Sequence, residues 1–185
     1  MSANAFTLAL SFLCIGNTVL AKLGAPGGPL KKHYDFPDVF EVVSEYKDAM
    51  SISDSDNDTI FDCLLTNRTE VDYEARTFKY VWTIQGVDGS PKEEVLMTGM
   101  PGPTSGLVRF FVEGDPTMRD ALIYYSDKSC SIMDVEYHGH QCILWVKRNL
   151  KDTVPQVCID NFMDICGVVI KPGRRDLCDD GEGDY

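Results

Sequence analysis

Apolar and polar residues alternate along several short segments in the middle of the chain. Residues 77–85 show this most clearly, because Phe78, Tyr80 and Trp82 fall on one face and polar residues such as Lys79 on the other. Alternation with a period of two predicts β-strands. Further strands are predicted at regular spacing over residues 93–98, 107–112, 121–126, 131–137 and 141–147. Such spacing favours an antiparallel meander, closed as a barrel or folded as a sandwich.

One helix is predicted on each side of these strands. The first has Pro37 as its first residue and runs to about Tyr46, since apolar residues recur there at helical spacing. The second ends at Gly167, with Asp152 or Thr153 as the cap at its start. The expected fold class is therefore all-β with short helices. Six to eight antiparallel strands between these helices match a lipocalin-like up-and-down β-barrel, with the C-terminal helix packed outside.

The two ends of the chain differ in composition from its middle. Residues 5–15 are apolar, no charge precedes Lys22, and Val19 and Ala21 suit a cleavage site, so a secretory signal peptide is predicted. The apolar run is too short for a membrane anchor. The expected organisation is a signal peptide over 1–21, a flexible arm over 22–35, a lipocalin domain over 36–178 and an acidic tail over 179–185.

Composition and charge narrow the class of protein further. The 185 residues hold 17 Lys and Arg against 29 Asp and Glu, a net charge of −12, which argues against binding to nucleic acid or to anionic membranes. An extracellular location favours disulfides, and six cysteines allow about 15 pairings. The cysteines beyond the signal are Cys63, Cys130, Cys142, Cys158, Cys166 and Cys178. Asn57 and Asn67 begin glycosylation sequons and are expected on the surface.

The C-terminal half carries motifs that resemble the salivary lipocalins of ticks. These are the run Tyr125-Ser126-Asp127-Lys128-Ser129-Cys130, the pair Leu144-Trp145, and Cys158 beyond them. Upstream, Asp38-Val39-Phe40 is similar to the start of the family's first helix. The family includes histamine and serotonin binders, leukotriene binders, complement inhibitors and a cholesterol-binding immunomodulator. The resemblance implies a secreted protein that sequesters a small-molecule host mediator without turning it over.

The resemblance also implies a disulfide scheme. The family's pattern pairs Cys63 with Cys178 and Cys130 with Cys158, which leaves Cys142 and Cys166. Strand parity supports the remaining pair. If the neighbours of Cys142 on its strand point into the barrel, Cys142 points out toward the final helix.

Catalysis and metal binding are not expected. The sequence contains only three histidines. It has neither a glycine-rich phosphate loop nor a serine in a nucleophile elbow. We therefore predict that the protein is not an enzyme and has no cofactor. His138 and His140, with Cys142 and Cys130, offer donors that zinc accepts. A solvated turn with Cys142 in a disulfide is the favoured interpretation, so no metal site is predicted.

The class of ligand depends on acids inside the barrel, because a buried ammonium needs a carboxylate partner. The family's amine binders have acids where this chain has Ser131, Ile143 and Ala121, and Asp120 is one place off. Glu93 or Glu94 still matches a family acid on its strand. Further acids, Asp54, Asp56 and Asp58, precede Cys63. Loss of most of the amine cage favours an amphipathic lipid or sterol, such as a fatty acid, a leukotriene or cholesterol.

The predicted ligand-binding interior combines aromatic, aliphatic and hydroxyl side chains. Its members are Phe78, Tyr80, Trp82, Glu94, Val108, Phe110, Val112, Ser131, Met133, Ile143 and Trp145. Arg109 and Arg119 lie near strand ends, and Arg109 has the outward parity. The alternatives are a biogenic amine ligand, a protein-directed immunomodulator acting on complement or host immune cells through its surface, a structural glycoprotein, and a filled interior without a cavity. A monomer is expected.

Overall fold

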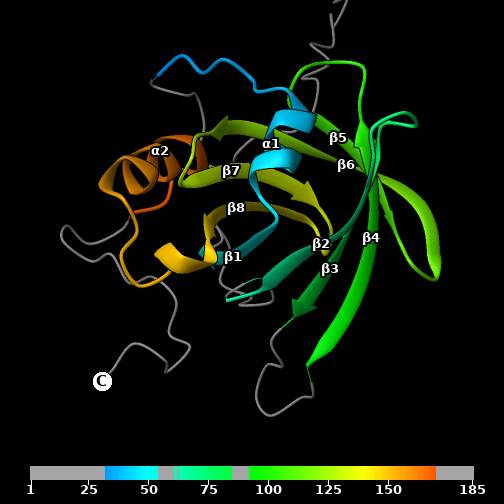
Figure 1. Ribbon diagram of the computed structural model, residues 1–185. Coiled ribbons are helices and arrows are strands. Elements are labelled where there is room, and N and C mark those ends of the chain that lie inside the picture. Colours follow the sequence, from blue (N-terminus) through cyan, green and yellow to red (C-terminus); the bar gives the residue numbers. More distant parts are fainter. Residues whose placement is uncertain (1–31, 54–60, 62, 85–91, 170–185) are drawn as a thin grey trace, which may run out of the picture.

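The computed structural model describes residues 32–53, 61, 63–84 and 92–169. Within them, eight antiparallel strands close into an up-and-down barrel in which each strand pairs with the next and the last pairs with the first (Figure 1). The strands are β1 (Asp48–Ser53), β2 (Leu65–Asp72), β3 (Thr77–Ile84), β4 (Glu93–Pro101), β5 (Leu107–Val112), β6 (Asp115–Ser126), β7 (Cys130–Glu136) and β8 (His140–Lys147). The helices are α1 (Val39–Glu45), the short 3-10 helix η1 (Arg148–Leu150) and α2 (Gln156–Cys166). The predicted barrel is confirmed.

Two of the strands have no counterpart in the sequence-based prediction. β1 carries Ala49 and Ser51, and β2 carries Thr66, at positions that are buried in the structure. Because these buried residues are small or polar, the alternation of hydrophobic and polar positions is weak along both strands. β6 also starts earlier than expected, at Asp115, because its exposed first half has no alternation to read.

The helix starts differ from the predicted ones. The first helix was predicted to start at Pro37, but α1 starts at Val39 and Asp38 caps it. The Asp38 Oδ1 accepts hydrogen bonds from the backbone of Phe40 at 2.8 Å and Glu41 at 3.2 Å. The expectation that Asp152 or Thr153 caps α2 is wrong. Pro155 occupies that position, with no side-chain hydrogen bond. Gly167 ends α2 with a φ of 70°, the left-handed conformation that glycine adopts at low cost, as predicted.

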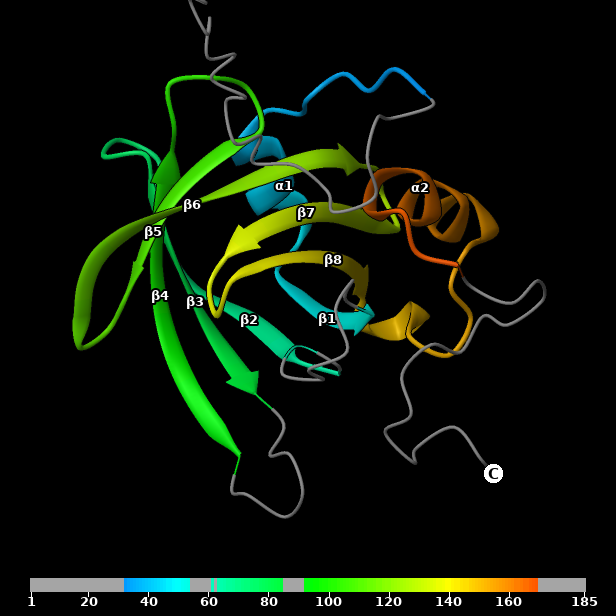
Figure 2. The same cartoon turned by 180° about the vertical axis from the view of Figure 1, so that it is seen from behind.

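The strands nearest α2 separate two apolar cores. Along β8, Ile143 and Trp145 belong to the core inside the barrel, whereas Leu144 and Val146 belong to a second core outside it. The outer core is completed by α2, which lies against β7 and β8 in both views (Figures 1 and 2). From α2 it receives Ile159, Phe162 and Ile165, each at most 2% exposed.

Disulfides fasten both ends of α2 to the barrel. Cys130 bonds to Cys158 and Cys142 bonds to Cys166, so these two predicted pairs are confirmed. Cys63 is also disulfide-bonded. Its predicted partner Cys178 lies outside the described residues, as do the predicted signal peptide, Asn57, Asp54, Asp56, Asp58 and the acidic tail.

The last residues of the predicted arm pack against α2. The Tyr34 side chain is buried, and its hydroxyl donates a hydrogen bond of 2.8 Å to Asp164 Oδ2. Burial and the Asp164 carboxylate raise the pKa of the Tyr34 hydroxyl well above its ordinary value. The backbone N–H of Lys32 donates to the same carboxylate at 3.1 Å. These two hydrogen bonds attach the segment before α1 to α2 without a covalent link.

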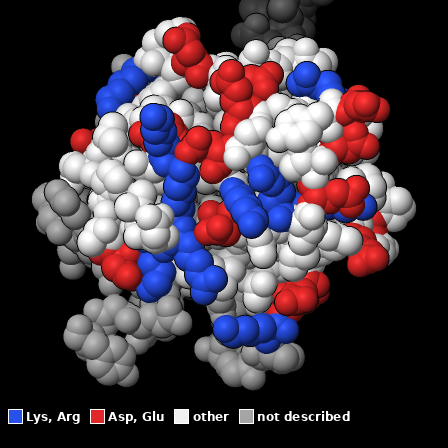
Figure 3. Space-filling view, in the orientation of Figure 1, with Lys and Arg blue, Asp and Glu red and all other residues white. Residues whose placement is uncertain are grey.

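On the face seen in Figure 1, charged side chains do not form separate acidic and basic patches. Figure 3 shows acidic and basic side chains interspersed across that face. Lys147 and Glu45 form an ion pair, and the Lys147 ammonium lowers the pKa of the Glu45 carboxyl. Asn67 is exposed on β2, so its sequon stands at the surface.

Candidate ligand cavity inside the barrel

A cavity lies inside the barrel beneath α1. Val42 and Val43 of α1 and Tyr46, which follows the helix as its C-cap, form one side of it, and the inner faces of the strands form the rest. The volume of the cavity is about 90 Å³, and one water molecule needs about 10–15 Å³ on the same measure. The cavity can therefore hold a slim ligand. A bulkier ligand requires movement of flexible side chains such as Met97 and Met133, which both line it.

Aromatic and aliphatic side chains make up most of the lining. The aromatic ones are Tyr46, Phe78, Tyr80, Trp82, Phe110 and Trp145. Gly99 faces Phe78 across β3 and β4, and a Cβ added there would lie 2.4 Å from the Phe78 ring. Glycine is therefore needed for this ring to lie against the sheet. No Asp, Glu, Lys or Arg lines the cavity among the residues that the structure describes.

Several polar atoms of the lining bond to the protein itself. The Tyr80 hydroxyl donates to the Tyr46 carbonyl at 2.6 Å, and the Tyr46 hydroxyl donates to the Asp127 carbonyl at 2.8 Å. Ser131 Oγ donates to the Tyr125 carbonyl at 3.3 Å. Burial raises the pKa of Tyr80 to about 12 and also raises that of Tyr46, so both hydroxyls stay neutral at physiological pH.

Aromatic rings pack against one another toward both ends of the barrel interior. At the α1 end, the Phe40 and Phe78 rings lie 6.0 Å apart. At the other end Phe61, Trp82 and Tyr137 pack edge to face with centroids 5.8–6.2 Å apart. The Arg119 guanidinium lies over the Tyr137 ring at 5.4 Å. The pKa of the Tyr137 hydroxyl is raised mainly by burial and, to a smaller extent, by the negative charge of the Glu93 carboxylate. Glu93 is therefore near this aromatic end.

Most of the predicted interior residues line the cavity. These are Phe78, Tyr80, Trp82, Val108, Phe110, Ser131, Met133 and Trp145. Val112 and Ile143 are buried in the same core without being part of the lining.

Glu94 was placed wrongly in the barrel interior. It is exposed, because the inward positions of β4 are Val95 and Met97. Two adjacent glutamates at the strand start left its parity ambiguous.

Sequence reasoning missed the contributions of the helix and of the two unpredicted strands. Val42, Ala49 and Thr66 line the cavity. The local pattern around them shows no alternation that marks an interior face. Phe61 stands alone between residues outside the description, so its place at the barrel end comes from tertiary packing.

The positions where the family's amine binders have acids are apolar or neutral here. Ala121 lines the cavity and Ile143 lies in the interior core, whereas Asp120 faces outward and forms an ion pair of 3.4 Å with Arg109. Arg119 pairs with Asp115, and this pair holds the pKa of Asp115 well below its ordinary value. Neither arginine reaches the lining.

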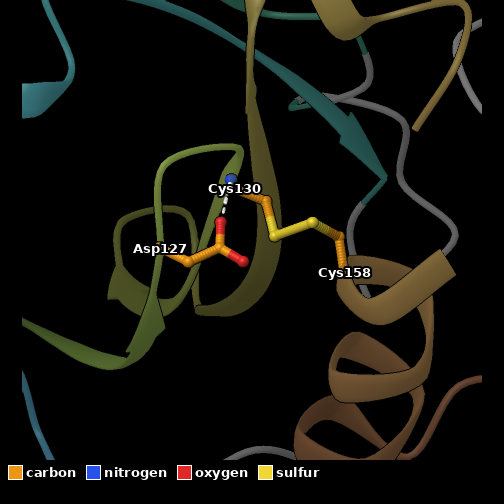
Figure 4. Close-up of side chains that lie close together, drawn as sticks. All are labelled: Asp127, Cys130 and Cys158. Atoms are coloured by element: carbon orange, nitrogen blue, oxygen red, sulfur yellow. Dashed lines mark hydrogen bonds between the residues drawn. A yellow bond between two sulfur atoms is a disulfide. The ribbon is translucent and has the colours of Figure 1, made fainter. Parts of the chain in front are cut away.

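Candidate metal donors are engaged in other bonds. Asp127, Cys130 and Cys158 lie close together, but the two sulfur atoms form a disulfide (Figure 4). The Asp127 carboxylate accepts hydrogen bonds from Ser129 N at 2.7 Å, Cys130 N at 2.9 Å and the Tyr125 hydroxyl at 2.8 Å. The Asp127 carboxylate therefore stabilises the turn between β6 and β7, and this turn positions Cys130 for its disulfide with Cys158.

The histidine segment also forms a turn. His138 and Gly139 connect β7 to β8 with positive φ angles of 54° and 98°, and both residues are exposed. Cys142 is bonded to Cys166, so its sulfur is no metal ligand. His140 lies 3.5 Å from the buried Asp134 carboxylate on the outer side of the barrel. The interpretation as a solvated turn agrees with this geometry.

Comparisons with known proteins place this barrel in a family. No helix of the described chain is long and apolar enough to cross a bilayer. A search of curated proteins found no match. Among solved structures, the chain is similar to Japanin from Rhipicephalus appendiculatus bound to cholesterol, with 16% identity and a TM-score of 0.48 over 65% of this chain and 87% of that one. The family model described as tick histamine binding protein matches residues 49–173. Since this match spans more than half of the chain, the protein belongs to the tick histamine-binding family of salivary lipocalins.

Proposed function

We propose that this salivary lipocalin sequesters an amphipathic lipid or sterol in its barrel. The observation that carries the proposal is the lining, which is aromatic and aliphatic and has no carboxylate among the described residues. Burial of apolar ligand surface against such a lining drives binding without any need for charge pairing. The protein acts outside the cell by holding a host inflammatory or immune mediator, and it needs no catalysis. Fatty acids, leukotrienes and cholesterol belong to this ligand class.

A biogenic amine is the second candidate because the family model bears histamine in its description. A buried ammonium needs a carboxylate partner. Among the described residues, the acids closest in sequence to the lining are exposed, as with Glu93 and Glu94, or face outward, as with Asp120. The cavity therefore favours the lipid over the amine.

Truncation of Phe110 is expected to weaken lipid binding by roughly 10- to 150-fold, equivalent to about 1.5–3 kcal/mol of lost apolar burial. Phe110 is 1% exposed and lines the cavity. The matched control is Phe111→Ala, on the same strand but outside the lining. Titration calorimetry with a fatty acid and cholesterol measures both variants, and circular dichroism checks their folding. Equal loss of affinity in both variants would argue against binding inside the barrel.

The amine candidate is tested with Glu93→Ala and Glu94→Ala. We expect neither substitution to change lipid affinity, since both side chains are exposed. If histamine bound below micromolar concentration and Glu93→Ala or Glu94→Ala abolished that binding, the ligand class proposed here would be wrong.

Affinity for a neutral lipid is expected to stay constant between about pH 5 and about pH 9. The titratable groups of the described lining are Tyr46 and Tyr80, whose raised pKa values keep both protonated across this range. Calorimetry at three pH values measures the effect. An amine held by a carboxylate behaves differently, because protonation of that carboxylate removes its partner. Loss of affinity as the pH falls toward about 4 would therefore indicate a carboxylate at the site.

A further inference from the structure

Among the residues that the structure describes, three buried polar atoms of the barrel interior have no hydrogen-bond partner. They are Ser51 Oγ, Thr66 Oγ1 and Trp145 Nε1. Their residues are 0%, 8% and 4% exposed, so bulk water does not replace the missing partners. Thr66 and Trp145 line the cavity. Native proteins rarely leave buried polar atoms unpaired, and a bound ligand or water commonly supplies the partner.

Strand register brings these three residues to one wall of the barrel. Ser51 of β1 lies directly opposite Trp145 of β8. Residues opposite each other in a sheet share a face, so Ser51 points inward with Trp145. Thr66 of β2 lies opposite Ala49, two residues before Ser51 on the same face of β1. The three residues therefore lie on the adjacent strands β8, β1 and β2 with the same inward parity, Thr66 and Trp145 in the cavity lining and Ser51 between them, and we call this group the polar wall.

Other polar atoms of the lining already have partners. The hydroxyls of Tyr46, Tyr80 and Ser131 each donate to a backbone carbonyl. The unmet hydrogen-bonding capacity is thus concentrated at the polar wall, within a lining that is otherwise apolar. An apolar ligand with one polar group would have its polar end fixed there.

The chemistry of the polar wall favours a neutral oxygen. An indole N–H only donates, whereas the two hydroxyls both donate and accept. A ligand hydroxyl or carbonyl oxygen can accept from Trp145 Nε1, and a hydroxyl can also donate to Ser51 or Thr66. An ammonium has no lone pair to accept from the indole. The three side chains carry no charge to balance a charged ligand group in a buried site.

A carboxylate is the remaining competitor, because it accepts hydrogen bonds and Arg68 lies two residues beyond Thr66 on β2. The Arg68 guanidinium donates to the Val43 carbonyl near the end of α1. It does not belong to the lining. Burial of a carboxylate at the polar wall would leave its charge without a cation in contact.

We infer that Ser51, Thr66 and Trp145 form a polar subsite that selects ligands with a single neutral hydroxyl or carbonyl oxygen over amines and carboxylates. The inference rests on the proposed function, since it assumes that an apolar ligand occupies the barrel. It adds the orientation of that ligand, with its polar group at the wall of β8, β1 and β2, and it narrows the ligand class to sterols, fatty alcohols and similar neutral lipids.

The test uses four probes with the same hydrocarbon chain and different ends: dodecanol, dodecane, dodecanoate and dodecylammonium. Displacement of a fluorescent apolar probe from the full-length secreted protein measures each affinity. We expect dodecanol to bind roughly tenfold more tightly than dodecane, the gain of one to two hydrogen bonds. Dodecanoate and dodecylammonium should bind more weakly than the alcohol.

Variants assign this preference to the polar wall. Thr66→Val and Ser51→Ala remove hydroxyls without adding bulk, and Trp145→Phe removes the indole donor. Combining Thr66→Val with Ser51→Ala should lower dodecanol affinity without lowering dodecane affinity, and adding Trp145→Phe should remove the remaining preference for dodecanol over dodecane. A merely structural role would weaken both probes together. Since Thr66→Val and Ser51→Ala remove unpaired polar atoms, thermal unfolding of these two variants should show no loss of stability.

Each other outcome overturns the inference in a recognisable way. Equal binding of dodecanol and dodecane would mean that the polar wall holds only water. Tighter binding of dodecanoate that Arg68→Gln abolishes would move the polar subsite to Arg68. Preference for dodecylammonium would support the amine candidate instead. If no probe bound, the proposed function itself would fail, and the inference with it.

Discussion

Replacement of Cys142 and Cys166 by alanine is expected to lower the free energy of unfolding by about 2–4 kcal/mol. The bond joins the last residue of α2 to β8 across a sequence separation of 24 residues. Without it, the unfolded chain gains conformational freedom, and the C-terminal end of α2 is held by packing alone. Urea denaturation under oxidising conditions measures the change through the fluorescence of Trp82 and Trp145, which are both buried in the barrel.

The matched control is Val157→Ala on the exposed side of α2, where the side chain is 49% exposed. It should leave the free energy of unfolding within about 0.5 kcal/mol of the wild type. If the double cysteine variant unfolded at the same urea concentration as the wild type, packing of Ile159, Phe162 and Ile165 would be enough to hold the helix.

Substitution of Ala121 by aspartate should destabilise the protein by an amount of order 4 kcal/mol at neutral pH. Ala121 is 4% exposed and lines the apolar cavity. Burial would raise the pKa of the new carboxyl above its unfolded value of about 4. The folded state would therefore bind a proton that the unfolded state releases. Stability is then lost as the pH rises from the unfolded pKa through the folded pKa, and the penalty is largest above both.

Ala121→Asn is the control, since it has nearly the same shape without a charge. The difference between the two variants in urea denaturation should be small near pH 4 and large near pH 8. Lipid affinity should fall in the aspartate variant over the same range. If the two variants were equally stable at both pH values, the cavity at Ala121 would be open to water and the lipid proposal would lose its main support.

Alternation along individual strands was sufficient to predict much of the barrel. The inward faces of β3, β5 and β8 follow directly from their sequences, because a buried face needs large apolar side chains at every second position. Phe78, Tyr80 and Trp82 show this along β3, and all three line the cavity. The same alternation placed Cys142 outside the barrel, in reach of Cys166. The tick lipocalin motifs near Cys130 supplied the pairing with Cys158.

Local patterns failed where the interior is small or polar. Ala49, Ser51 and Thr66 are inside the barrel, yet none of them marks a strand by hydrophobicity. Their burial results from closure of β1 onto both β2 and β8. Parity at the start of β4 was ambiguous for a similar reason, and it was settled by pairing with β3, which turns Val95 inward and Glu94 outward.

The candidate site depends on contacts between elements that are far apart in the chain. Amino-acid composition and strand parity, read along the chain, indicate an aromatic interior with few acids, and hence an apolar ligand. They do not reveal that the Tyr80 hydroxyl donates to the Tyr46 carbonyl, whereas Thr66 Oγ1 and Trp145 Nε1 have no partner among the described residues. Hydrogen-bond satisfaction is a property of the closed barrel, because each partner comes from a different strand or helix and meets the others only when the barrel is formed.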